Sequence, residues 1–166
     1  MLRPRLFLVD TSVWIDFFLR GERGYEEARQ FFMEAERREI GLLYTATTLK
    51  DVFYLIPRRL RTRALSEGDA TEVSFAPAAW ACVRAMTEIA TVAPLSLPEC
   101  DLAWMLRNKH GDFEDNLVIA AAETCNADYV VTYDRELLEH FPPACITPQQ
   151  ALELLELASP RGEQER

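Results

Sequence analysis

Residues 6–16, LFLVDTSVWID, bring an apolar run directly up to a carboxylate. The first four residues of this stretch are all apolar, which is typical of a β-strand that is covered on both faces of a sheet. Asp10 follows at once, and a carboxylate that ends a buried strand is costly unless it is paired or bound to a metal ion. The stretch therefore predicts a buried strand with a functional acid at its end.

Short β-rich runs alternate with helical patterns along the rest of the chain. Further strands are predicted over residues 41–45, 90–93, 129–132 and 144–146. Helices are predicted over residues 25–38, from Pro77 with Trp80, Val83 and Met86 facing inward, from the capping box SLPE at 96–99, over residues 112–125 and 135–139, and from a second capping box, TPQQ, at 147–150. This alternation indicates βαβ units, and hence an α/β fold whose mainly parallel sheet is covered by helices on both sides.

The composition is that of an ordinary globular protein. A chain of 166 residues is expected to form one domain, over residues 1–158, with a polar tail at 159–166. The net charge of -9 argues against a protein that coats nucleic acid through its bulk charge. No apolar run is long enough for a membrane span or a signal peptide. We therefore expect a cytoplasmic protein whose four cysteines, Cys82, Cys100, Cys125 and Cys145, are buried, free and reduced.

Acidic residues recur at the ends of predicted strands and at the starts of predicted helices. Besides Asp10, these residues are Asp51, Asp112, Asp115 and Asp134. Each has a purely structural alternative, since Thr48 and Asp51 match a capping box, and Asp112 and Asp134 could cap their own helices. In a parallel sheet, however, these positions converge on one edge, where carboxylates repel one another unless a cation binds. An all-oxygen site of this kind suits Mg²⁺ or Mn²⁺.

Three stretches of the chain match the motifs of a single protein family. They are residues 8–16, LVDTSVWID, residues 115–122, DNLVIAAA, and residues 131–135, VTYDR. These stretches resemble the first, third and fourth acidic motifs of the PIN-domain ribonucleases, which include the VapC-type toxins of bacterial toxin–antitoxin pairs. The order and spacing also match, and the resemblance extends over roughly residues 6–146.

The resemblance implies a three-layer α/β/α fold with a short parallel sheet, and the activity of a metal-dependent endoribonuclease that leaves 5′-phosphate and 3′-hydroxyl ends. It implies that Asp10, Asp115 and Asp134 belong to the metal site and that the hydroxyl of Ser12 supports Asp10. The implied role is the toxin of a toxin–antitoxin pair. The expected partners are an RNA substrate, a cognate antitoxin protein and a second copy of the chain in a homodimer.

The second acidic position departs from the family pattern. Asp51 stands where the family usually has a Glu, and its side chain is one methylene shorter. Asp112 is an additional carboxylate that is expected to compensate in part as a further metal ligand. Either Asp51 or Asp112 is expected to orient the attacking water. Asn116 and Thr132 are expected to contact the acids and hold them in position without binding the metal themselves.

An acidic protein needs a local basic surface to attract RNA. Arg58, Arg59, Arg61 and Arg63 closely follow Asp51, and arginine suits bidentate contact with phosphates and stacking on bases. Two alternatives stay open for this cluster. It could be a solvated helix end that pairs with acids elsewhere, or it could be a docking site for an acidic or amphipathic antitoxin segment.

The histidines and the first aromatic residues are expected to have structural roles. His110 and His140 are expected on the surface or in loops, because no Ser–His or Cys–His nucleophilic pair is evident. Trp14, Phe17 and Phe18 are expected in the core or at a dimer face, because their spacing is helical.

Other classes of protein fit the acids less well. A phosphatase of the haloacid dehalogenase type needs a second Asp two residues after the first, where this chain has Ser12. A receiver-like signalling domain needs a Lys after a late strand, yet the only lysines are Lys50 and Lys109. The alternative that stays open is a catalytically inactive PIN-like binding module, which the unusual Asp51 keeps in consideration.

Overall fold

A parallel sheet lies at the centre of the structure, which is a computed structural model that describes residues 4–68 and 74–158. The predicted tail at 159–166 lies outside the described residues. The five strands are β1 (Leu6–Val9), β2 (Gly41–Thr45), β3 (Thr91–Ala93), β4 (Tyr129–Val131) and β5 (Cys145–Ile146). They are all parallel and lie in the order β3-β2-β1-β4-β5. The predicted strands are confirmed, and the opening stretch forms the central strand.

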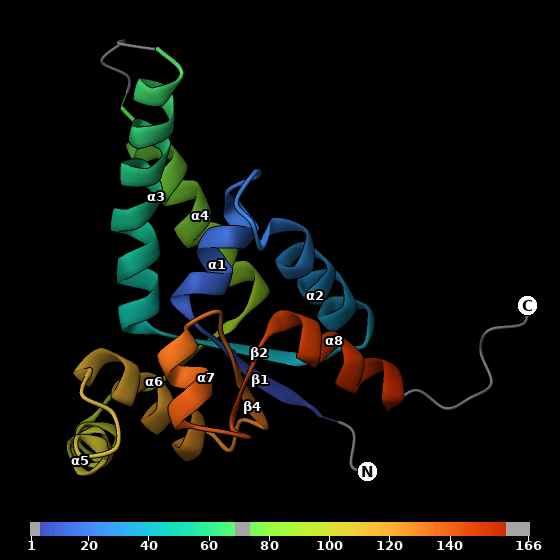
Figure 1. Cartoon of the computed structure of the whole chain (residues 1–166), viewed down its shortest axis with the longest axis vertical. Coiled ribbons are helices and arrows are strands. Elements are labelled where there is room, and N and C mark those ends of the chain that lie inside the picture. Colours follow the sequence, from blue (N-terminus) through green and yellow to red (C-terminus); the bar gives the residue numbers. More distant parts are fainter. Residues whose placement is uncertain (1–3, 69–73, 159–166) are drawn as a thin grey trace, which may run out of the picture.

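Helices cover both faces of the sheet because successive side chains of β1 point to opposite faces (Figure 1). One face carries α1 (Thr11–Phe18), α2 (Tyr25–Arg37) and α8 (Pro148–Leu157), and the other carries α5 (Leu97–Leu106), α6 (Phe113–Thr124) and α7 (Arg135–His140). Phe7 and Val9 pack with the first set, whereas Leu8 packs with α6 and α7. The predicted three-layer α/β/α fold is confirmed. Trp14 is fully buried in the first layer, and Phe17 and Phe18 pack on the same cluster.

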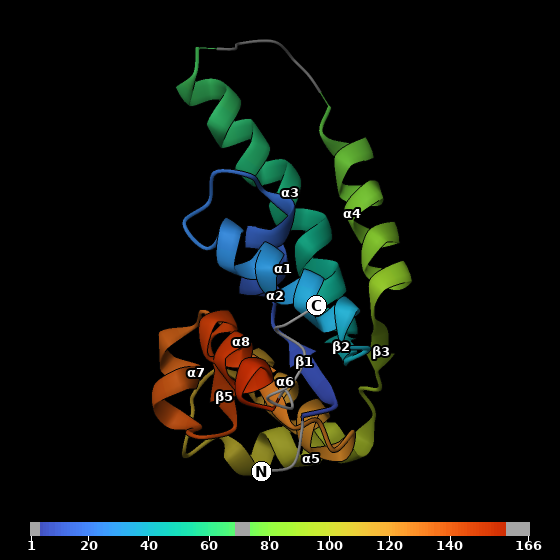
Figure 2. The same cartoon turned by 90° about the vertical axis from the view of Figure 1, so that its right-hand side faces the viewer.

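Two long helices, α3 (Ala46–Ser66) and α4 (Ala76–Ile89), lie side by side and extend beyond the sheet as an arm (Figures 1 and 2). α3 continues through Pro57, so Arg58, Arg59 and Arg61 lie within the helix and Arg63 lies in its last turn. α4 buries Met86 as predicted, but the expectation that Trp80 faces inward is wrong, since Trp80 is 62% exposed. α4 packs mainly on α3, and the Trp80 ring contacts the ring of Phe53, at 4.8 Å between centroids.

Side-chain caps begin most of the helices that surround the carboxyl edge of the sheet. The predicted boxes at 96–99 and 147–150 are both present, and Asp112 and Asp134 cap α6 and α7. The capping box that was the structural alternative for Thr48 and Asp51 is absent. α3 begins directly at the end of β2, so the last strand residue, Thr45, is its cap and accepts a hydrogen bond from the Thr48 N–H at 3.1 Å.

All four cysteines lie in the described ranges and are free, as predicted. Only Cys145 is buried, however, and Cys100 is exposed on α5, so the expectation that all four are buried is wrong. α5 packs on α6 with Ala103 inward, which leaves its other sides to solvent. None of the helices in the described part of the chain is both long and apolar enough to cross a membrane.

Candidate active site

An acidic cleft of about 370 Å³ opens at the carboxyl edge of the sheet, where β1 lies between β2 and β4. Open α/β sheets bind ligands at this edge. The walls of the cleft carry seven acidic residues, Asp10, Asp16, Asp51, Asp112, Glu114, Asp115 and Asp134, and one arginine, Arg59. The structure thus brings all five of the predicted acids into one cavity, from β1, α3, α6 and α7.

Asp10 is held in place by hydroxyl groups from two segments of the chain. Its Oδ2 accepts hydrogen bonds from Ser12 Oγ and Thr132 Oγ1, both at 2.8 Å. The Ser12 hydroxyl in turn accepts from the Tyr133 N–H at 3.0 Å, and the Thr132 hydroxyl accepts from the Asp134 N–H at 2.8 Å. Asp10 is buried apart from 8% of its surface, so these donors offset much of the cost of burying its charge. They also tie the end of β1 to the end of β4.

Asp112, Asp115 and Asp134 lie at helix N-termini, where backbone N–H groups favour negative charge. Asp112 Oδ1 accepts from the N–H groups of Glu114 and Asp115, and Asp134 makes the same kind of cap on α7. Burial raises the pKa of Asp115, and the negative charges of Asp112, Asp10 and Asp134 raise it further. The acids of the cleft therefore repel one another, and a bound cation would relieve that repulsion.

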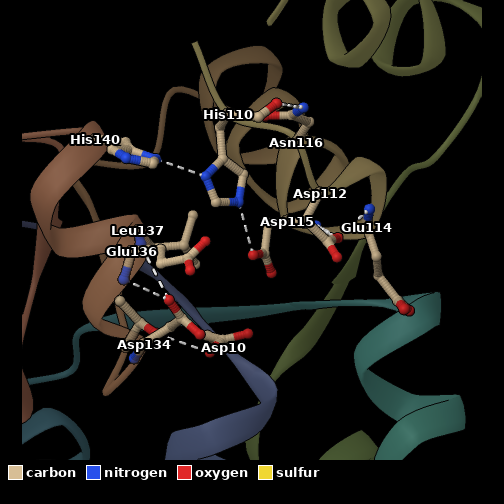
Figure 3. Close-up of polar contacts among 11 residues, drawn as sticks. Asp10, His110, Asp112, Glu114, Asp115, Asn116, Asp134, Glu136, Leu137 and His140 are labelled. Atoms are coloured by element: carbon tan, nitrogen blue, oxygen red, sulfur yellow. Dashed lines mark hydrogen bonds and ion pairs between the residues drawn. The ribbon is translucent and has the colours of Figure 1, made fainter. Parts of the chain in front are cut away.

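His110 lies in the loop between α5 and α6, as expected, but it is buried beneath this cluster and not on the surface. Its Nε2 lies 2.9 Å from Asp115 Oδ2, and its Nδ1 lies 2.8 Å from Nδ1 of His140 (Figure 3). His140 itself is exposed at the end of α7, as expected. Asn116 donates from Nδ2 to the His110 carbonyl at 2.8 Å. Asn116 thus supports the backbone of His110 and does not contact the acids of the cleft through this bond.

Asp51 reaches the cleft from α3, beside a lysine that the sequence did not single out for this site. Lys50 Nζ lies 3.1 Å from both Asp51 Oδ1 and Glu114 Oε1, and these two carboxylates raise the pKa of Lys50. The ammonium group therefore links α3 to α6 at the mouth of the cleft. Sequence reasoning missed Lys50 and Glu114 because the two residues are 64 positions apart.

Asp16 and Tyr133 form a wall of the cleft around Gly24. Asp16 Oδ2 accepts from the Gly24 N–H at 3.1 Å, and the Tyr133 hydroxyl donates to the Gly24 carbonyl at 3.0 Å. A Cβ at Gly24 would lie 2.4 Å from Asp16 Oδ2 and 2.6 Å from the Tyr133 ring. This close approach therefore requires glycine. Burial raises the pKa of Asp16, which sequence reasoning did not include in the site.

The four predicted arginines lie on different sides of α3. Only Arg59 lines the cleft, and it pairs with Glu22 at 3.3 Å. Arg63, one turn further, lies 3.5 Å from the same carboxylate and donates to the Arg20 carbonyl at 2.8 Å. Arg58 and Arg61 are exposed and lie outside the cleft lining. The helical spacing of four residues explains why Arg59 and Arg63 share a face.

The residues of the cleft fit a hard divalent cation by their chemistry. All the candidate ligands are carboxylate oxygens, which Mg²⁺ and Mn²⁺ prefer. In the described part of the chain, no three acidic, histidine or cysteine side chains are already grouped closely enough to hold one ion. The hydrogen bonds of Asp10 fall on Oδ2, and the capping bonds of Asp112 and Asp134 fall on Oδ1. One oxygen of each carboxylate is thus engaged in positioning it.

Comparisons with known proteins agree with this architecture. The family model of the PIN domain matches residues 7–136. No curated protein matches the sequence. VapC20 of Mycobacterium tuberculosis, described as a toxin that cleaves the sarcin-ricin loop, has a TM-score of 0.56 at 20% identity, over 78% of this chain and 90% of that one.

Two further solved structures share the fold. A chain of a toxin-antitoxin complex from Klebsiella pneumoniae has a TM-score of 0.55 at 17% identity, over 85% of this chain and 96% of that one. PAE2754 from Pyrobaculum aerophilum has a TM-score of 0.57 at 21% identity, over 92% and 90%. The family match covers well over half of the chain and includes the motifs at Asp10, Asp115 and Asp134. This protein therefore belongs to the PIN-domain family.

Proposed function

We propose that this protein is a metal-dependent endoribonuclease that acts in the cytoplasm as the toxin of a toxin–antitoxin pair. The observation that carries this proposal is the convergence of Asp10, Asp51, Asp115 and Asp134 on one open cleft from four separate segments of the chain. Membership of the PIN-domain family supports a nuclease. The shared fold of the two toxin structures supports the more specific role.

Phosphodiester hydrolysis requires an activated water molecule and stabilisation of the charge on the phosphate. A bound Mg²⁺ or Mn²⁺ would supply both, by lowering the pKa of water and by neutralising oxygen charge. In our proposal Asp10, Asp115 and Asp134 hold the cation, and Asp112 contributes a further carboxylate. Ser12 and Thr132 keep Asp10 aimed, through the bonds described above.

Asp51 has the position of a residue that orients the attacking water. It lines the cleft from α3, and Lys50 holds its Oδ1. In our proposal a water molecule lies between this carboxylate and a cation held by the other acids, because the side chain of Asp is one methylene shorter than that of Glu. Asp51 is therefore compatible with an active enzyme.

Activity should depend on an added divalent metal. We expect the purified protein to cut single-stranded RNA in Mg²⁺ or Mn²⁺ and to stop in excess EDTA, because repelling carboxylates cannot hold the phosphate without a cation. The measurement is the appearance of 5′-phosphorylated fragments on a denaturing gel. Cleavage that persists in EDTA would contradict the proposal, and an absence of cleavage in either metal would favour the inactive binding module.

The toxin role has its own test and its own partners. Induced expression in a bacterial host should arrest growth, and co-expression of the neighbouring antitoxin-like reading frame should relieve the arrest. The proposal also includes a homodimer, which light scattering would detect as twice the chain mass of 19.0 kDa. A nuclease that does not arrest growth would keep the activity and lose the toxin role.

Arg59 is the arginine that we propose contacts RNA phosphate, because it alone among Arg58, Arg59, Arg61 and Arg63 lines the cleft. Arg59→Ala should weaken RNA binding and reduce the slope of log affinity against log salt by about 1. Arg61→Ala is the matched control on the same helix and should change neither by a comparable amount. Binding is measured by fluorescence anisotropy at several salt concentrations, in an Asp115→Asn background that prevents cleavage. Equal effects of the two substitutions would mean that the cluster acts as a diffuse patch.

A further inference from the structure

Two histidines, the buried His110 and the exposed His140, connect the acidic cleft to the surface of α7. The His110 side chain has no solvent exposure, yet both of its ring nitrogens have polar partners. Nε2 faces Asp115 Oδ2 at 2.9 Å, and Nδ1 faces Nδ1 of the exposed His140 at 2.8 Å (Figure 3). The ring also packs edge-on against Phe141, at 5.8 Å between centroids. It is therefore clamped between a carboxylate and a second imidazole.

The partners determine which nitrogen of His110 carries the proton. An ionised carboxylate only accepts hydrogen bonds, so Nε2 must donate to Asp115. A neutral imidazole has one N–H, and Nδ1 of His110 then accepts a hydrogen bond. With His110 neutral and Asp115 ionised, the donor for that bond is the Nδ1–H of His140. The chain of contacts is thus directional, from His140 through His110 to Asp115.

We propose that His110 is a positioning residue, which holds Asp115 Oδ2 so that the carboxylate is fixed for cation binding, while His140 sets the tautomer of His110. This inference rests on the function proposed above. Groups that bind metals are commonly oriented by partners of this kind, and loss of such a partner typically weakens metal affinity by about 10- to 100-fold. The bond from Asn116 to the His110 carbonyl keeps the backbone of His110 in register with Asp115 on α6.

Two conservative substitutions separate the two sides of the ring. In His110→Gln the amide nitrogen takes the place of Nε2, so the donor to Asp115 is kept and the contact with His140 is lost. In His110→Asn the amide oxygen takes the place of Nδ1 as the acceptor, so the contact with His140 is kept and the donor to Asp115 is lost. Each variant loses one buried hydrogen bond, and a merely structural role would therefore affect the two alike.

The experiment is calorimetric titration of the full chain with Mn²⁺, beside thermal unfolding without metal. We expect His110→Asn to lose about 10- to 100-fold in Mn²⁺ affinity and His110→Gln to retain most of the wild-type affinity. Two variants that bind Mn²⁺ as tightly as the wild type would overturn this inference and leave the proposed function intact. A wild-type protein that binds no Mn²⁺ would overturn both.

A second measurement needs no substitution. Ring-nitrogen NMR of the wild-type protein should show His110 protonated at Nε2, with His140 protonated at Nδ1. His110 protonated at Nδ1 alone would reverse the direction of both hydrogen bonds and overturn the inference, whether or not the His110 variants fold.

Discussion

Asp10→Asn should reduce RNA cleavage by more than about 100-fold. Loss of a group that only orients a metal ligand typically costs about 10- to 100-fold, and loss of a proposed metal ligand itself should cost at least as much. Asp10 has three features that make it central to the cleft. It directly follows the central strand, only 8% of its surface is exposed, and its Oδ2 accepts hydrogen bonds from two hydroxyl groups. An asparagine can keep an oxygen in that position, but it removes the charge that a divalent cation requires. Cleavage is measured with labelled RNA in Mn²⁺.

The fold should survive this substitution, which separates loss of chemistry from loss of structure. Asp115→Asn is the companion variant and should also be inactive. Because the pKa of Asp115 is raised in the folded protein, the folded state holds that proton more tightly than the unfolded chain does. Stability therefore falls as the pH rises through the shifted pKa, and the ionised carboxylate destabilises the metal-free protein at neutral pH.

Asp115→Asn should accordingly be at least as stable as the wild type in EDTA at neutral pH. Added Mn²⁺ should stabilise the wild type and leave the variant nearly unchanged, since a ligand stabilises only the state that binds it. Thermal unfolding with and without Mn²⁺ measures both effects. An inactive variant that is also unfolded would leave the loss of cleavage without a chemical explanation, and a variant that cleaves normally would remove Asp115 from the site.

Trp14→Ala should destabilise the protein by about 3–5 kcal/mol, the cost of replacing a large buried aromatic residue with a small one. The Trp14 side chain is fully buried, and its ring lies 4.5 Å from that of Phe32 and 5.8 Å from that of Phe18. It joins α1 to α2 in the layer that covers β1. Such a loss is a large share of the roughly 5–15 kcal/mol that a domain of this kind possesses. Urea unfolding monitored by circular dichroism gives the difference.

Trp80→Ala is the matched control, since it removes the same side chain from an exposed position. Trp80 is 62% exposed and makes one ring contact, with Phe53. The expected loss is about 1 kcal/mol, the magnitude of one aromatic pair. Similar losses for the two variants would mean that the arm formed by α3 and α4 has a buried role that its exposure does not indicate.

The pattern of apolar residues predicted the strands of the sheet well, because strands and helix starts depend on residues that are close together in the sequence. A short apolar run such as 6–9 is typical of a strand that is covered on both faces. The capping boxes at 96–99 and 147–150 place helix starts through contacts over three residues. The Thr48–Asp51 capping box is absent because Thr45, the last residue of β2, caps α3 three residues earlier. Trp80 failed because an apolar residue at helical spacing does not reveal whether a second layer covers it.

The sequence pointed to the acids of the candidate site and to the Ser12 and Thr132 hydroxyl groups that contact Asp10, but not to His110 as a partner of Asp115. Asp10, Asp51, Asp112, Asp115 and Asp134 follow strands or begin helices, and the carboxyl ends of parallel strands share an edge, so their convergence on the cleft could be inferred. His110 could not be inferred, because its burial depends on α7 and on Phe141, about 30 residues away in sequence. The four arginines after Pro57 lie on different sides of α3 because the helix continues through Pro57, and among them only Arg59 lines the cleft.

By itself, the sequence determined how strands and helices alternate along the chain, the possible caps at Asp112 and Asp134, and the acid that follows the first strand. These features depend on residues within a few positions of one another. Only the tertiary structure decided that Lys50 meets Glu114, that Gly24 closes against Asp16, and that His110 lies beneath Asp115. Each of these pairs is brought together by packing helices on the sheet, and the spacing of residues along the chain holds no record of which faces will meet.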